Sequence, residues 1–363
     1  MDPTVSRRFP LIARPRPSCA PLDQRVSELR EHADHAQQHH DAASATAVFN
    51  LAALLASDCG LPELARTWCH RLATAAITHN SDPRHALEPV VNLARLHIRA
   101  GNGTAAWTLL ETLFHAVDTR TDTTIDGLTI PAALLTATPE THTTTRTWLW
   151  TVLLGTGAHA LVTAGRWDDA STRLHRYKGV GARMLDGRQV AVIAHATAGR
   201  HQQARAMLDA TQPGRPWENA VTACLHLHIP AQDPTEQTAI ALSTHHALGT
   251  VEPGLAVFRT RLGLTLIDAL GSSHPTARRI ARHLIRDAAQ DGYAARDLLA
   301  HPGCRSIATD QQIEQLTDLV TACGLARGAL PTPHLATLHA ALDHAESVIA
   351  MQGSRRPHQP AQG

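Results

Sequence analysis

The chain has 363 residues, which is enough for two domains of ordinary size or for one elongated helical array. Hydrophobic residues make up 43% of the chain and charged residues 18%, which excludes an intrinsically disordered protein. The 33 basic and 32 acidic residues leave a formal charge of +1, so the bulk charge does not indicate a nucleic-acid-binding surface.

The first 21 residues are rich in proline and arginine, as in the run Arg14-Pro-Arg-Pro-Ser. Such a stretch does not favour a helix, so residues 1–21 are expected to form a disordered arm, and residues 353–363 a disordered tail. The arm lacks the apolar stretch of a signal peptide, and no apolar run approaches the about 18 residues of a membrane span. The six cysteines include no CxxC pair. Free thiols in a cytoplasmic protein are the simplest interpretation.

Residues 22–352 are expected to form a single helical domain, because glycine or proline separates one predicted helix from the next throughout. No stretch has the alternation of a half-buried strand, so the sequence predicts an all-α chain without a sheet. A Thr-rich inserted loop is expected near 118–147, and helices near 309–322 and 333–351 are expected to cap the array.

A repeat becomes visible when four turn glycines are aligned. Each is followed five residues later by alanine, preceded seven residues earlier by a small or modest residue, and followed nine residues later by an apolar one. This spacing predicts two antiparallel helices that cross closely, with a small residue at the crossing. The glycines are Gly60, Gly101, Gly165 and Gly199, and the alanines are Ala65, Ala106, Ala170 and Ala204.

This pattern resembles the tetratricopeptide repeat, whose two helices carry small residues at comparable places, and Gly165 and Gly199 are one repeat length of 34 residues apart. The segments at 47–65 and 185–191 also resemble an actinobacterial group of tetratricopeptide-like proteins. Some members of that group resemble the sensor domains of regulators, and others accompany natural-product pathways. The resemblance implies a right-handed α-solenoid of antiparallel helix pairs.

Polar residues on the first helix of each pair are the candidate binding residues, because the resemblance places them on the concave face of the array. Asn50 and Asn92 are each followed by Leu-Ala, and a carboxamide can both donate to and accept from a peptide main chain. Arg95 and Arg188 would suit a carboxylate or phosphate. The candidate set for a peptide ligand is Asn50, Asn92, Arg95, Asp186, Arg188 and Gln189.

The alternative interpretation is a pathway enzyme of unusual helical fold, in which His97, His195, Asp186 and Arg188 line a pocket and perform acid–base work. No dinucleotide, P-loop, zinc-protease or serine-hydrolase motif supports it. We therefore favour a non-catalytic scaffold or adaptor that binds a protein or peptide. We expect no cofactor, no metal, and no direct contact with nucleic acid or membrane, and leave open whether the chain forms a homodimer.

Overall fold

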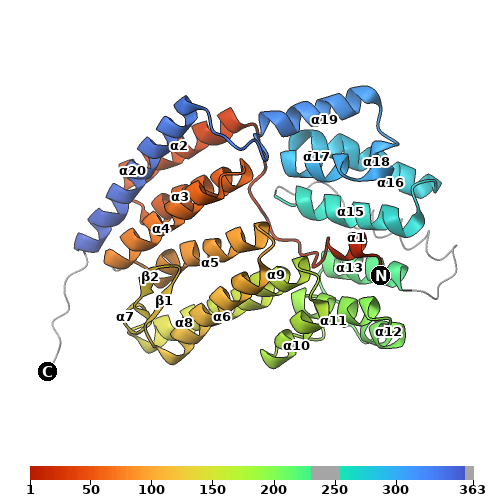
Figure 1. Cartoon of the computed structure of the whole chain (residues 1–363), viewed down its shortest axis with the longest axis horizontal. Helices are drawn as coiled ribbons and strands as arrows, with labels where there is room; N and C mark the ends of the chain where they lie inside the picture. The colour runs from red at the N-terminus through yellow and green to blue at the C-terminus, as the bar shows by residue number, and fades with distance from the viewer. Residues whose placement is uncertain (80, 230–253, 356–363) are drawn as a thin grey trace. The chain divides into compact units, whose positions relative to one another are not determined.

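The computed structural model describes residues 1–79, 81–229 and 254–355. The described chain is mostly helical, and its helices pack in repeated pairs (Figure 1). It divides into two compact units, where the sequence predicted one domain over 22–352. Unit 1 consists of Met1–Pro21 and Leu161–Cys323, and unit 2 of Leu22–Ala160 and the chain from Gly324. Of the expected tail, residues 356–363 lie outside the described residues.

Unit 2 is built from long helices joined by short turns. Many of these helices have proline in the first turn, where its missing N–H costs no hydrogen bond. The helix that starts at Pro139 continues through a π-helical turn into α9, which begins in unit 2 and ends in unit 1. The elements are α2 (Leu22–His39), α3 (Ala42–Asp58), α4 (Pro62–Thr78), α5 (Pro83–Arg99), α6 (Gly103–Thr119), β1 (Thr123–Ile125), β2 (Leu128–Ile130), α7 (Ala132–Leu135), α8 (Pro139–Val152), η1 (Leu153–Gly157), α9 (Ala158–Thr163) and α20 (Thr332–Arg355).

The four aligned glycines end the first helix of a pair, as predicted. Each has a φ between 75° and 80°, a conformation that glycine adopts without a steric penalty. The residue after each glycine donates its N–H to a carbonyl five residues back, as Leu61 does to Ala56 at 2.9 Å. These bonds satisfy carbonyl groups that the helix end leaves without a partner, and the next helix begins two residues after the glycine.

The small residues of the repeat are buried, which confirms the predicted register. The four alanines after the turn glycines are each 0% exposed, and the small or modest residues before the glycines are at most 5% exposed. A larger side chain at these places would have to displace the neighbouring helix.

A small sheet corrects the prediction of a chain without strands. β1 and β2 pair antiparallel, with Thr124 opposite Thr129, and the turn residues Asp126 and Gly127 have φ values of 53° and 79°. Two consecutive positive φ angles are typical of the tight turn that matches the twist of a hairpin. The region near 118–147 is therefore a hairpin followed by helices, and the buried side chain of Ile130 anchors the hairpin.

The last helix of the chain, α20, packs against α2, α3 and α4. Figure 1 shows α20, in blue, beside the red α2. Where the chain re-enters unit 2, two main-chain hydrogen bonds hold it against the end of α3. Ala326 N–H donates to Asp58 O and Gly328 N–H donates to Cys59 O, both at 2.7 Å. The segment expected to cap the end of the array therefore covers the first helices of unit 2.

Unit 1 contains the N-terminal segment and the middle of the chain. None of the helices in the described residues is long and apolar enough to cross a membrane. The elements of unit 1 other than the end of α9 are α1 (Pro3–Ser6), α10 (Trp167–Arg176), α11 (Asp186–Thr197), α12 (His201–Asp209), α13 (Pro216–His228), α15 (Ala256–Leu270), α16 (Pro275–Asp287), η2 (Ala288–Gln290), α17 (Gly292–Leu299), α18 (Pro302–Arg305) and α19 (Asp310–Ala322).

The N-terminal segment, residues 1–21, is packed along unit 1, in contrast to the expected disordered arm. Phe9 is 0% exposed and Leu11 is 2% exposed. Farther along, Cys19 donates its N–H to Asp291 Oδ2 at 3.1 Å and accepts the N–H of Gly292 at 2.8 Å. The prolines prevent a long helix, but they do not prevent the apolar side chains between them from being buried.

Candidate functional site

The structure brings Asn50, Asn92 and Arg95 together on two neighbouring helices of unit 2. Asn50 lies on α3 and Asn92 on α5, and Asn92 Nδ2 donates to Asn50 Oδ1 at 2.7 Å. The guanidinium of Arg95, one turn farther along α5, donates to Asn92 Oδ1. Both asparagines are half-buried and Arg95 is exposed. The three side chains therefore form one connected polar group at the surface of unit 2.

A second polar contact lies two helical turns farther along the same pair of helices. Arg99 Nη1 donates to Ser57 Oγ and to Asp58 Oδ1, both at 2.8 Å. The two contacts join residues 42 positions apart in both cases, so α3 and α5 run parallel and in register. We call the set Asn50, Ser57, Asn92, Arg95 and Arg99 the polar ladder.

The hydrogen bonds of the ladder leave one carboxamide only partly used. Asn92 donates to Asn50 and accepts from Arg95, so both ends of its side chain have a partner. Asn50 accepts one bond, and its own NH₂ group has no partner in the described part of the chain. Asn50 therefore keeps two N–H donors that can be offered to another molecule.

The other three candidates, Asp186, Arg188 and Gln189, lie at the start of α11 in unit 1, and they bind the chain itself. Arg188 is 8% exposed, and its guanidinium donates to Thr211 Oγ1 at 2.8 Å and to the carbonyls of Gly181 and Met207 at 2.8 and 2.6 Å. These bonds use its donors to hold the neighbouring loop and α12. Arg188 thus makes internal contacts in unit 1, and its role in binding a carboxylate or phosphate stays a prediction.

Gln189 is fully buried and binds the main chain of Leu11 on both sides. Its Oε1 accepts the N–H of Leu11 at 2.7 Å, and its Nε2 donates to the carbonyl of Leu11 at 2.9 Å. One carboxamide thus satisfies both polar groups of a buried residue in a segment that is neither helix nor strand. Beside it, Asp186 Oδ2 lies 2.9 Å from Arg14 Nη2. Burial raises the pKa of Asp186, and the charge of Arg14 offsets part of that rise.

The two histidines of the enzyme alternative belong to different units. His97 belongs to unit 2 and His195 to unit 1. His195 Nδ1 accepts a hydrogen bond from Arg200 Nε at 2.9 Å, and burial together with the charge of Arg200 lowers its pKa. His195 is therefore neutral at pH 7, and its unprotonated nitrogen already has a donor.

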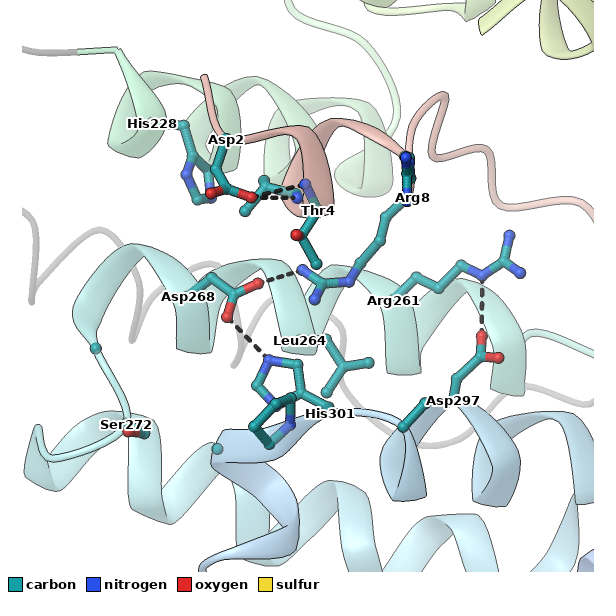
Figure 2. A pocket seen from close by; sticks show the side chains of 16 residues that line it. Asp2, Thr4, Arg8, His228, Arg261, Leu264, Asp268, Ser272, Asp297 and His301 are labelled. Carbon is teal, nitrogen blue, oxygen red and sulfur yellow. Dashed lines mark hydrogen bonds and ion pairs between the residues drawn. The ribbon is translucent and has the colours of Figure 1, made fainter. Parts of the chain in front are cut away.

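A pocket of about 690 Å³ that the sequence did not predict lies in unit 1, where the N-terminal segment and α13 face α15, α17 and α18 (Figure 2). Arg8 reaches from the N-terminal segment to Asp268, with Nη1 2.5 Å from Oδ2. His301 Nε2 lies 2.9 Å from the other oxygen of Asp268. Burial pushes the pKa of Asp268 upward, but the bonds from His301 and Arg8 outweigh it and hold this pKa below its ordinary value.

The two histidines at the pocket are held by the protein in defined tautomers. His301 Nδ1 accepts the N–H of Cys304 at 3.1 Å, so its proton is on Nε2 and both nitrogens are engaged. His228 Nε2 lies 3.0 Å from the carbonyl of Thr265, which fixes its proton there and leaves Nδ1 as an acceptor. Burial lowers the pKa of His228, so this ring is neutral at pH 7.

The pocket residues come from four distant parts of the chain, so no local spacing could have indicated them. Asp268 and His301 are separated by 33 positions, and Arg8 precedes Asp268 by 260. The described residues contain no group of three or more His, Cys, Asp or Glu side chains that could hold a metal ion. Comparisons with protein-family models, with curated proteins and with solved structures found no match for this chain.

Proposed function

We propose that this protein is a non-catalytic scaffold that binds an extended peptide segment of another protein at the polar ladder of unit 2. Its helix pairs would form a right-handed, tetratricopeptide-like solenoid, as the resemblance implies. The resemblance also favours a role in regulation or in presenting a peptide to modifying enzymes of a natural-product pathway.

The observation that carries this proposal is the contact between Gln189 and Leu11. Gln189 and Asn50 each lie ten residues before the glycine that ends their helix, Gly199 and Gly60. At this position of one repeat, a carboxamide binds both main-chain groups of a non-helical segment. Asn50 places the same chemical group at the same position of another repeat, at the surface and with its NH₂ unused. A peptide main chain is the ligand that this group matches best.

The enzyme alternative is less well supported by the histidines that it needs. A general base must have an unprotonated nitrogen that can reach the substrate. Of the two histidines in that alternative, His195 already accepts a bond at Nδ1 from Arg200 Nε. We therefore retain the binding interpretation.

The proposal is tested by selecting peptides from a random displayed library against the full-length protein and measuring their affinity for variants. A double variant in which alanine replaces both Asn50 and Asn92 removes the donor and the acceptor of the hydrogen bond between them. We therefore expect little change in the free energy of unfolding. Each lost amide contact is worth about 0.5–1.5 kcal/mol, so the selected peptides should bind the double variant roughly five- to hundredfold more weakly.

The matched control is Asn102→Ala in the same unit, because Asn102 is exposed and its side chain makes no capping bond. This variant should bind the selected peptides as tightly as the unaltered protein. Equal affinity of the double variant and the control would overturn the assignment to the ladder. Failure of the double variant to fold would show that the asparagines serve the structure, and that result would also contradict the proposal.

A further inference from the structure

The pocket of unit 1 has hydrogen-bond donors without partners, whereas its carboxylates are all engaged. Both oxygens of Asp268 are bound, by Arg8 and His301, and both oxygens of Asp297 are bound, by Arg261 and Arg296. Asp2 accepts the main-chain N–H groups of Thr4 and Val5 at the start of α1. The anionic groups of the pocket therefore have little capacity left for a ligand.

The arginines that line the same pocket, in contrast, keep N–H donors that have no partner in the described residues. Arg8 uses one nitrogen for Asp268, and no other bond of its side chain exists within the described residues, although that side chain is only 13% exposed. Arg261 uses Nε alone, and the exposed Arg7 has no side-chain partner in the described part of the chain. A guanidinium carries five N–H donors, and unsatisfied donors in a partly enclosed space favour an anion.

We infer that this pocket binds a small molecule carrying a phosphate or carboxylate group, with Arg8 and Arg7 donating to that group. Figure 2 shows the guanidinium of Arg8 lying among Thr4, Asp268 and Leu264, with Asp268 fixing its orientation. The volume of about 690 Å³ lies within the range typical of small-molecule sites. His228 and Ser272 on the pocket wall supply an acceptor and a hydroxyl for the polar remainder of the ligand.

The site is independent of the polar ladder, because every residue that lines it belongs to unit 1. Arg8 is part of the N-terminal segment, so a bound anion would also hold that segment in place. Loss of small-anion binding would therefore leave peptide binding at the ladder unaffected, and the two proposals can fail separately.

The test is calorimetric titration of the full-length protein, at constant ionic strength, with three probes of similar size. Glycerol 3-phosphate carries a phosphate, glycerate carries a carboxylate, and glycerol carries no charge. We expect saturable binding at one site for at least one of the two anions and none for glycerol. A preference for glycerol 3-phosphate over glycerate, or the reverse, identifies the group that the arginines select.

Variants show whether the binding occurs in this pocket. Arg8→Gln should weaken binding of the anion about tenfold or more, since it removes a charge-assisted donor, and Arg7→Gln should weaken it several-fold. The control is Arg14→Gln, which breaks the ion pair of the N-terminal segment with Asp186 outside the pocket. This control should leave the affinity unchanged.

Three outcomes would overturn the inference. They are no saturable binding of either anion at millimolar concentration, an affinity that Arg7→Gln and Arg8→Gln leave unchanged, and an equal loss in Arg14→Gln. If Arg8→Gln does not fold, Arg7→Gln decides the question, because the Arg7 side chain is exposed and has no partner within the described chain.

Discussion

Arg25 and Asp58 form a buried ion pair between α2 and α3, with Arg25 Nη2 2.7 Å from Asp58 Oδ2. Their side chains are 10% and 3% exposed. Replacing Asp58 with alanine leaves the guanidinium of Arg25 in a buried place without this carboxylate, which typically costs about 3–5 kcal/mol. We expect a correspondingly lower urea midpoint for Asp58→Ala. Asp34→Ala, at a half-exposed carboxylate, is the control, and equal midpoints for the two variants would contradict the expectation.

The Gln189→Leu variant keeps the volume at α11 but leaves the main-chain N–H and carbonyl of Leu11 without their partners. An unsatisfied buried polar group costs about 1–3 kcal/mol, so the N-terminal segment should detach more readily from unit 1. Amide hydrogen exchange at Leu11 and tryptic cleavage after Arg8, which precedes Phe9, should both become faster. The control Gln24→Leu alters an exposed bond to Glu28 and should change neither rate. Unchanged exchange at Leu11 in Gln189→Leu would mean that the carboxamide is not what holds the segment.

The buried alanines of the repeat should not accept a larger side chain. Ala204→Leu places three additional carbon atoms at a position that is 0% exposed, and overpacking of this kind costs about 1–3 kcal/mol. Ala206→Leu, at an exposed position of the same helix, is the control. The same loss is expected for Ala170→Leu. Thermal melting temperatures that do not differ between Ala204→Leu and Ala206→Leu would mean that the crossing tolerates a leucine.

Stability should fall as the pH decreases below the ordinary pKa of histidine. Burial lowers the pKa values of His195, His226 and His228, so below about pH 6.5 the unfolded chain binds protons that the folded chain does not. The raised pKa of Asp186 acts in the opposite direction, because there the folded chain holds the additional proton. Urea midpoints measured between pH 7.5 and 5.5 give the net effect of these groups on the stability of the fold.

The contribution of His228 to this pH dependence can be measured with a single variant. His228→Gln keeps a donor for the carbonyl of Thr265 but cannot take up a proton in the unfolded chain. Its urea midpoint should therefore depend less steeply on pH than that of the unaltered protein. Identical slopes would show that His228 is not one of the groups responsible.

The repeated helix pairs could be predicted from the sequence because their signals are local. A glycine that ends a helix and an alanine five residues later lie within one turn and the following helix. The hairpin had a local signal too, since Asp126 and Gly127 lie between alternating threonine and apolar residues, and it was overlooked among the threonines.

The packed N-terminal segment and the pocket had no local signal. Phe9 and Leu11 lie on either side of Pro10 in a short apolar stretch without helical or strand periodicity, and the partner of Leu11 is 178 positions away. A lone arginine such as Arg8 gives no indication that Asp268 will lie beside it. The ladder is intermediate: the shared Asn-Leu-Ala strings indicated Asn50 and Asn92, but their bond to each other depends on two helices lying parallel.

The return of α20 to α2 has a consequence for synthesis on the ribosome. Residues 22–160 are made early, but the helix that covers α2, α3 and α4 emerges only after all of unit 1 has been translated. Until then, apolar side chains of α3 that pack against α20 are without their final neighbours, and contacts of such long sequence separation form slowly. We expect the nascent chain to depend on chaperones during that interval, and unit 1, whose last residue is Cys323, to complete its fold first.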